Sequence, residues 1–233
     1  MKHFTFFLAA GIFAQALLAS AADSKSEVLD SIKKLAEKSS YAWTATFKSD
    51  GGNANWKQGP TEGKAEKGGY TYLTSSIGDT DYEVAFKGTS SAIKWDSDWV
   101  SSEALQGEEA WIARRLKEFK APAAEAEELA TKAKELKKGD DGLYSGDLTE
   151  EGVKGMFSRM GRSNQNAETT NAKGSVKFWL KDGALVKYQF NMQGKVSWGP
   201  DQEFDVNRTS TVEIKTPGAT KLSVPDEAKK KLS

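Results

Sequence analysis

Near the C-terminus, two stretches that alternate apolar and polar residues flank a dipeptide typical of tight turns. Residues 176–181 lie on one side, residues 186–192 on the other, and Asp182-Gly183 between them. A period of two places alternate side chains on opposite faces of a sheet, and Asp-Gly is a strong signal for a two-residue hairpin turn. The sequence therefore predicts a long antiparallel hairpin, with Phe178 and Tyr188 in its apolar set.

Shorter strands are predicted along much of the remaining chain. Their segments are rich in aromatic and β-branched residues and end at turn-forming residues such as glycine, proline or aspartate. These strands comprise residues 41–47, 55–57, 61–66, 69–75, 82–87, 91–100, 142–147 and 204–214. Residues 162–170 are polar and are predicted to form a loop.

The helical spacing of apolar residues predicts the helices. Ser24-Lys25-Ser26-Glu27 is a capping box, which indicates that a first helix begins there. An insertion in the middle of the chain carries two amphipathic helices, over residues 105–119 and 122–138, and a further helix over residues 149–160 begins with Thr149 as its cap. One or two helical turns are predicted over residues 226–232.

The order of these elements defines the fold class. A helix is followed by a run of strands, a helical insertion and further strands, without an internal repeat. That order is typical of α+β proteins, in which helices gather on one face of an antiparallel sheet. Because a sheet of many twisted strands curls, we expect a strongly curved sheet, or half-barrel, with the helices packed on its concave face.

The N-terminus has the pattern of a secretory signal peptide. Lys2 and His3 precede an apolar run over residues 4–18, and small residues follow at 19–21. This run is shorter than the ~20 residues that a membrane-spanning helix needs. We therefore expect residues 1–21 to be a cleaved signal peptide and residues 22–233 to form one domain, secreted or periplasmic, without stable membrane insertion.

The residues missing from the chain limit its chemistry. His3 is the only histidine and there is no cysteine, so residues 22–233 cannot build a Ser-His or Cys-His nucleophile or a zinc site with imidazole or thiolate ligands. Lysine plus arginine and aspartate plus glutamate number 33 each, a balance that argues against a nucleic-acid partner. We expect a protein that binds a ligand, is not an enzyme and needs no cofactor.

Aromatic residues suggest what such a ligand is. The chain has seven tryptophans, and each large aromatic side chain buries roughly 150–250 Å². A cavity walled by them would bind a lipid or an acyl chain, although each of these residues taken singly is more typical of a solid core. The predicted lining residues are Trp43, Phe47, Trp95, Trp99, Met156, Phe157, Met160, Phe178, Tyr188, Phe190 and Met192.

Five stretches carry a resemblance to a known family: residues 92–99, 142–149, 175–183, 212–217 and 224–228. With the order of the elements, they resemble the LolA-like superfamily, which includes periplasmic lipoprotein carriers and mycobacterial lipid-binding proteins of the LppX/LprG kind. The resemblance implies a half-open barrel closed by helices around a cavity for acyl chains. The chain lacks the lipid-bearing cysteine of the LppX/LprG kind, so the resemblance implies a free carrier or sensor.

Other patterns leave alternatives open. Trp179, out of phase with Phe178, indicates a surface for stacking sugars, as in a carbohydrate-binding module or a carboxylate-based glycan hydrolase. A structural envelope protein without a small ligand is a third possibility. Acidic pairs at 79–81 and 96–98 lack the loop pattern of a calcium site and are predicted to be turn carboxylates, so no metal is expected.

Two further patterns concern charge and modification. Arg114-Arg115 is predicted to lie on a solvated helix face, with anionic lipid headgroups as the alternative partner. Residues 207–209 match an N-glycosylation acceptor.

Overall fold

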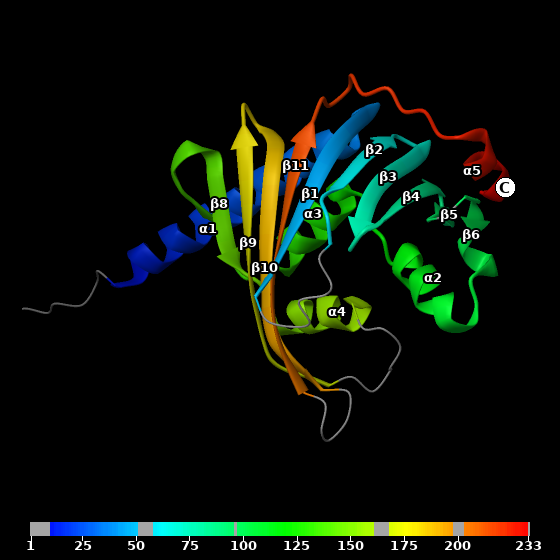
Figure 1. The fold of residues 1–233 in the computed structure, drawn as a ribbon. Helices are drawn as coiled ribbons and strands as arrows, with labels where there is room; N and C mark the ends of the chain where they lie inside the picture. Colours follow the sequence, from blue (N-terminus) through cyan, green and yellow to red (C-terminus); the bar gives the residue numbers. More distant parts are fainter. Residues whose placement is uncertain (1–9, 51–57, 96, 161–167, 198–202, 233) are drawn as a thin grey trace, which may run out of the picture.

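The structure is a computed structural model and describes residues 10–50, 58–95, 97–160, 168–197 and 203–232. These residues form one antiparallel sheet of 11 strands with five α-helices (Figure 1). The strands are β1 (Ser40–Asp50), β2 (Thr61–Glu66), β3 (Tyr70–Ile77), β4 (Thr80–Lys87), β5 (Ser90–Lys94), β6 (Val100–Ser101), β7 (Lys137–Lys138), β8 (Leu143–Asp147), β9 (Glu168–Lys181), β10 (Ala184–Ser197) and β11 (Glu203–Lys215). The helices are α1 (Ala10–Ala36), α2 (Ala110–Lys117), α3 (Pro122–Lys132), α4 (Glu150–Met160) and α5 (Asp226–Lys231).

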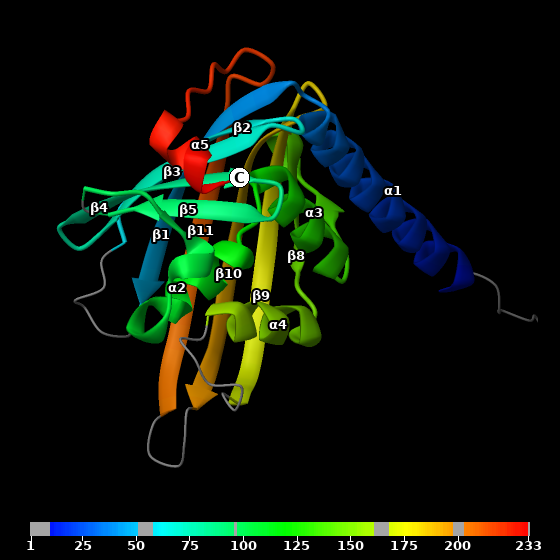
Figure 2. The ribbon, with the colours of Figure 1, turned by 90° about the vertical axis from the view of Figure 1, so that its right-hand side faces the viewer.

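The strand order explains where the helices lie. It runs β6-β5-β4-β3-β2-β1-β11-β10-β9-β8-β7, so the first and last long strands pair at the centre of the sheet. The strands β6 and β7 lie at opposite edges, so the chain between them must cross a face of the sheet. That crossing contains α2 and α3, and Figure 2 shows both on the same side as α4.

The main core lies between the sheet and the helices. Ile32 of α1, Leu129 of α3 and Val153 of α4 are buried in one cluster with Phe178 and Tyr188 of the C-terminal hairpin. A second cluster joins β3, β4 and β5 to α2. The helix α5 packs on the other face of β4 and β5, because its cluster contains their out-of-phase alanines. Within the described residues, no helix is both long and apolar enough to cross a membrane.

Most strand predictions are confirmed. The strand β2 has the predicted bounds, and the hairpin of β9 and β10 turns at Asp182-Gly183, where both residues have positive φ. Thr149 caps α4, since its Oγ1 accepts a hydrogen bond of 3.1 Å from the Gly152 N–H. The α+β class is therefore confirmed, whereas the strong curvature of a half-barrel stays a prediction. The predicted strand at residues 55–57 lies outside the described residues.

Two predicted elements in the first half are interrupted. The strand predicted over 91–100 ends at Lys94, and Val100 starts the separate strand β6. The helix predicted over 105–119 is shorter, because α2 begins only at Ala110. Gly107 has a φ of +60°, a value outside the right-handed helical region.

Other predicted boundaries are also wrong. The helix α3 ends at Lys132, since the Lys134 N–H bonds to the Asp147 carbonyl at 2.9 Å and residues 137–138 pair with β8. The capping box does not start a helix in this full chain, because α1 already extends from Ala10. The predicted loop is shorter at its end, since β9 begins at Glu168.

Gly63 allows β2 to pack against an indole. It lies opposite Trp43 in the sheet register, and a Cβ at this position would overlap the Trp43 ring. We expect Gly63→Ala to lower the free energy of unfolding by about 1–3 kcal/mol, the usual range for overpacking, as measured by urea unfolding. Gly139→Ala is the control, because its Cβ would have no neighbour nearer than the Leu143 carbonyl oxygen at 3.7 Å. Equal losses in the two variants would contradict the packing argument.

Candidate functional site

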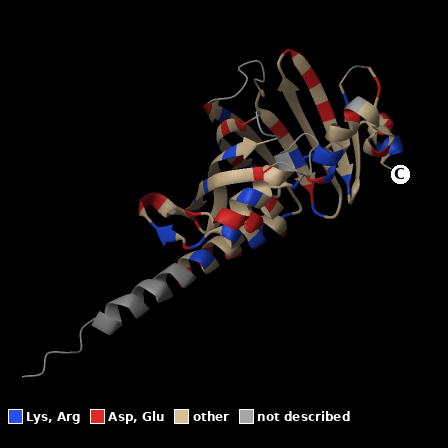
Figure 3. Cartoon of the chain, turned by 90° about the horizontal axis from the view of Figure 1, so that it is seen from below, with Lys and Arg blue, Asp and Glu red and all other residues tan. Residues whose placement is uncertain are grey.

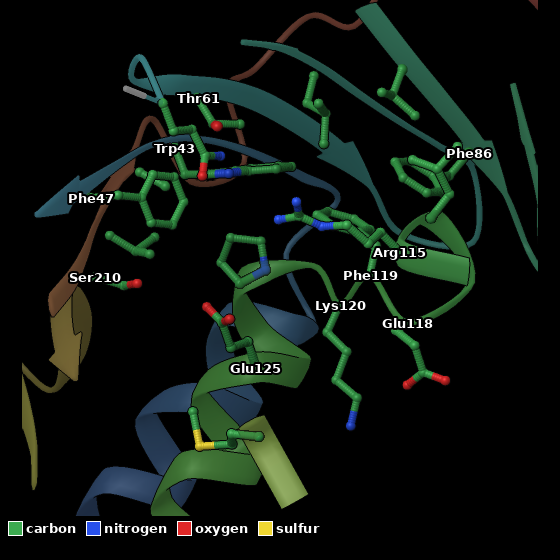
Figure 4. A pocket seen from close by; sticks show the side chains of 18 of the residues that line it. Trp43, Phe47, Thr61, Phe86, Arg115, Glu118, Phe119, Lys120, Glu125 and Ser210 are labelled. Atoms are coloured by element: carbon green, nitrogen blue, oxygen red, sulfur yellow. The ribbon is translucent and has the colours of Figure 1, made fainter. Parts of the chain in front are cut away.

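A pocket of about 340 Å³ lies between the sheet and the helices (Figure 4). Its sheet wall comes from seven strands, β1 to β5 with β10 and β11. On β1 the lining residues are Trp43, Ala45 and Phe47, which alternate along the strand and so share one face. The helices α2, α3 and α4 cover this face, whereas α5 packs on the other one.

The helical wall of the pocket is also largely apolar. Trp111, Ile112 and Leu116 of α2 line it, together with Met156 of α4. Phe119, which follows α2, also lines the pocket and stacks on Phe86 of β4 with ring centroids 4.4 Å apart and an angle of 17° between the planes. This aromatic stack ties the end of α2 to the sheet.

The structure brings many of the predicted lining residues together. Those that line the pocket are Trp43, Phe47, Trp95, Met156, Tyr188, Phe190 and Met192. The others are placed differently. Phe157 and Phe178 lie in the filled core, where Phe178 is 0% exposed. Trp99 is buried in the cluster under α5, on the other face of the sheet. Met160 is the last residue of α4, and its side chain lies outside the described part. That the lining residues bind a ligand stays a prediction.

Arg208 of β11 lies in the sheet wall of the pocket. The Cζ atom of Arg208 on β11 lies 4.5 Å from the centroid of the Phe47 ring, and its Nη2 donates to Gln58 Oε1 at 3.1 Å. Burial lowers the pKa of Arg208 to about 10, and the charge of Arg115 lowers it further while that of Glu125 opposes the effect. At neutral pH the guanidinium is therefore still charged inside an apolar wall.

Two carboxylates of α3 in the pocket have donors. The Tyr188 hydroxyl donates to Glu125 Oε2 at 2.6 Å, and burial first, then the charge of Glu125, raise the pKa of Tyr188 well above its usual value. Lys120 Nζ lies 2.7 Å from Glu128 Oε2, and Lys132 forms an ion pair with the same carboxylate. Further polar residues in the lining are Gln58, Thr61, Arg115, Glu118 and Ser210, and apart from Arg208 the remaining lining residues are aromatic, aliphatic or methionine.

These polar residues were not among the predicted lining residues. Arg208 is in phase with Val206, Ser210 and Val212 along β11, and a charge in the apolar phase of a central strand is a signal that was present in the sequence. Arg115 was predicted to be a solvated helix residue. It is exposed, but it also lines the pocket.

Other predicted features lie away from the pocket. Trp179 is half-buried on the opposite face of β9 from Phe178, with Lys187 Nζ 5.1 Å from its ring centroid. Asp79 and Asp81 flank the start of β4, and Asp96 lies outside the described residues. Across the described part of the chain, no group of three His, Cys, Asp or Glu side chains is placed to hold a metal ion. Figure 3 shows positive and negative residues interspersed along the visible elements.

Comparison with known proteins gives a likeness in fold. No family model and no curated protein matches the sequence. The structure is similar to LprF from Mycobacterium bovis, with 13% identity, a TM-score of 0.47 and coverage of 90% of this chain and 99% of that one. The lipoprotein LppX of Mycobacterium tuberculosis is 11% identical, with a TM-score of 0.47 and coverage of 88% of this chain and 100% of that one. A LolA superfamily protein from Nitrosomonas europaea is 11% identical, with a TM-score of 0.32 and coverage of 88% of this chain and 95% of that one. All three structures are at most 13% identical in sequence to this chain, so the likeness concerns the fold alone.

Proposed function

We propose that this chain is an exported protein that binds or carries a hydrophobic ligand, a lipid or an acyl chain, between its sheet and its helices. The observation that carries the proposal is the pocket of about 340 Å³ with aromatic and aliphatic walls. Ligand sites are typically mostly apolar clefts with a few polar groups. Each ligand methylene buried there contributes about 0.8 kcal/mol to the binding free energy. An acyl chain would therefore bind without any catalytic group in the pocket.

The side chains of the pocket suit a flexible ligand. Met156 and Met192 lie on opposite walls, and methionine adapts its shape to irregular partners. Trp43 and Phe190 add rigid apolar surface on the sheet wall. These features favour binding over catalysis, in keeping with the absence of histidine from residues 22–233.

The proposal includes a sheet that wraps around its ligand as a half-barrel. Support comes from Trp95, which directly follows β5, and Phe190 of β10, which both line the pocket. Their strands are six positions apart in the sheet, which corresponds to roughly 29 Å in a flat sheet. A sheet curved around the pocket, with the helices on its concave face, would bring two such distant strands together.

The proposal also includes removal of residues 1–21 on export. Their support is the apolar run over 4–18 with its small residues at 19–21. N-terminal sequencing of protein recovered from outside the cytoplasm should then begin near Ala22.

Tryptophan emission tests ligand binding. Adding an acyl-chain ligand, dodecanoate, should shift the emission of the purified protein, and Trp95→Phe should reduce that shift because Trp95 lines the pocket. Trp99→Phe is the matched control, since Trp99 is buried under α5 on the other face and its variant should keep the full shift. Native mass spectrometry of protein from its own source should show a bound ligand mass. Absence of both a ligand mass and an emission shift would rule out the carrier.

A further inference from the structure

The pocket contains an unusual set of charges for an apolar site. Its lining includes three cations and three carboxylates: Arg115, Lys120, Arg208, Glu118, Glu125 and Glu128. Polar groups in such a pocket usually fix the orientation of one part of the ligand. Their placement therefore indicates which part of a ligand they would hold.

Arg208 is built into the sheet itself. In the register of β11 it lies opposite Met192 of β10 and Ser49 of β1, and its guanidinium covers the Phe47 ring at 4.5 Å. A charge in an apolar wall is costly unless an opposite charge compensates it. Arg208 has polar partners in Gln58 and Glu125, and its guanidinium still lines the pocket, where it could bind an anionic group of a ligand.

Arg115 approaches from the helical wall. Figure 4 shows its side chain extending into the pocket toward Trp43, whereas the charged groups of Glu118 and Lys120 point away from that ring. The positive charge of Arg115 acts on Arg208, since it contributes to lowering the pKa of Arg208. An anion between the two guanidiniums would relieve this repulsion.

Two of the carboxylates in the pocket have different partners. Glu128 forms ion pairs with Lys120 and Lys132. Glu125 accepts the Tyr188 hydroxyl and also attracts Arg208. Arg115 and Arg208 both line the same pocket, where their guanidiniums are placed to bind an anionic group of a ligand.

We propose, on the basis of the proposed function, that the ligand is a single-chain anionic amphiphile whose carboxylate or phosphate head binds between Arg115 and Arg208 while its chain lies along Trp43 and Phe190. The planar fork of a guanidinium matches both kinds of head group with paired hydrogen bonds. The volume of about 340 Å³ is near the lower end of ligand pockets, which span about 300–1,000 Å³, so it suits one chain. The two arginines thus select the head group, and the apolar walls hold the tail.

Probes with one chain length and different head groups test this inference. Dodecanoate and dodecyl phosphate should bind at least about tenfold more tightly than dodecanol, equivalent to about 1.4 kcal/mol, and dodecyltrimethylammonium should bind most weakly. Isothermal titration below the critical micelle concentration measures each affinity. Inorganic phosphate, which has no chain, should not compete at the same concentration.

Variants locate the head group. Arg208→Met should reduce the preference for dodecanoate over dodecanol to about twofold or less, because dodecanol carries no charge for the guanidinium to bind. Arg115→Gln should act in the same direction and keeps the test informative if Arg208→Met fails to fold. Arg114→Gln is the control, because Arg114 is exposed and does not line the pocket.

The outcomes separate this inference from the function on which it rests. Equal binding of dodecanoate and dodecanol would overturn the anion site while leaving a hydrophobic pocket. Failure of every chain-bearing probe to bind would overturn the proposed function itself. Tight binding of inorganic phosphate alone would overturn the amphiphile and indicate a site for a free anion.

Discussion

Replacing Phe178 with alanine should lower the free energy of unfolding by about 3–5 kcal/mol, the range for removing a buried phenyl ring. Phe178 is 0% exposed and lies in the main core. In the sheet register it lies between Tyr188 of β10 and Tyr144 of β8, and its ring centroid is 6.4 Å from that of Tyr188. Chemical unfolding with urea or guanidinium chloride measures the loss.

Phe47→Ala is the matched comparison. Phe47 is the same residue type, but it is half-buried and lines the pocket. The loss of the Phe47 ring should cost less stability than the loss of the Phe178 ring. The Phe47 ring borders the pocket, so folding removes less of its apolar surface from water. Phe47→Ala should weaken dodecanoate binding, whereas Phe178→Ala should do so only through unfolding. Equal stability losses would mean that the pocket side is packed as tightly as the core.

This pair also shows how far the sequence predicts the site. Alternation along β9 and β10 correctly places Phe178, Tyr188 and Phe190 on the helical face. It does not distinguish the filled part of that face from the open part, because the difference depends on where α3 and α4 cover the sheet. Those positions are set by contacts between residues far apart in the sequence.

Two local patterns in the sequence bear on the site in opposite ways. Trp95 and Trp99 share the parity of one continuous strand, but the interruption between Lys94 and Val100 places them on opposite faces. Arg208, by contrast, stands in the apolar phase of a strand that was correctly predicted. A charge at that phase is the local signal in the sequence for the polar part of the pocket.

The pairing of β1 with β11 illustrates a different limit. Local patterns predicted both strands, but their pairing joins residues such as Phe47 and Ser210 that are far apart in the chain. No turn fixes that register. The register depends on how the two meanders, β1 to β6 and β7 to β11, pair with each other, and the pocket forms where they meet.

Ser210→Phe would test directly whether this meeting point is open. Ser210 lies in register between Phe47 and Phe190, its residue is 3% exposed, and it lines the pocket (Figure 4). A phenyl ring there would take the place of part of the ligand. Displacing two methylenes, at about 0.8 kcal/mol each, already corresponds to about a tenfold loss of affinity. We therefore expect dodecanoate binding to weaken by about tenfold or more.

Stability gives the second measurement on the same variant. In an open pocket the new ring gains burial, so the free energy of unfolding of Ser210→Phe should stay the same or rise. In a filled core the same ring would be overpacked and would cost about 1–3 kcal/mol. Thr211→Phe, on the opposite face of β11, is the control and should leave dodecanoate binding unchanged. A destabilised Ser210→Phe that still binds dodecanoate as the unmodified protein does would place the ligand elsewhere and make this region ordinary core.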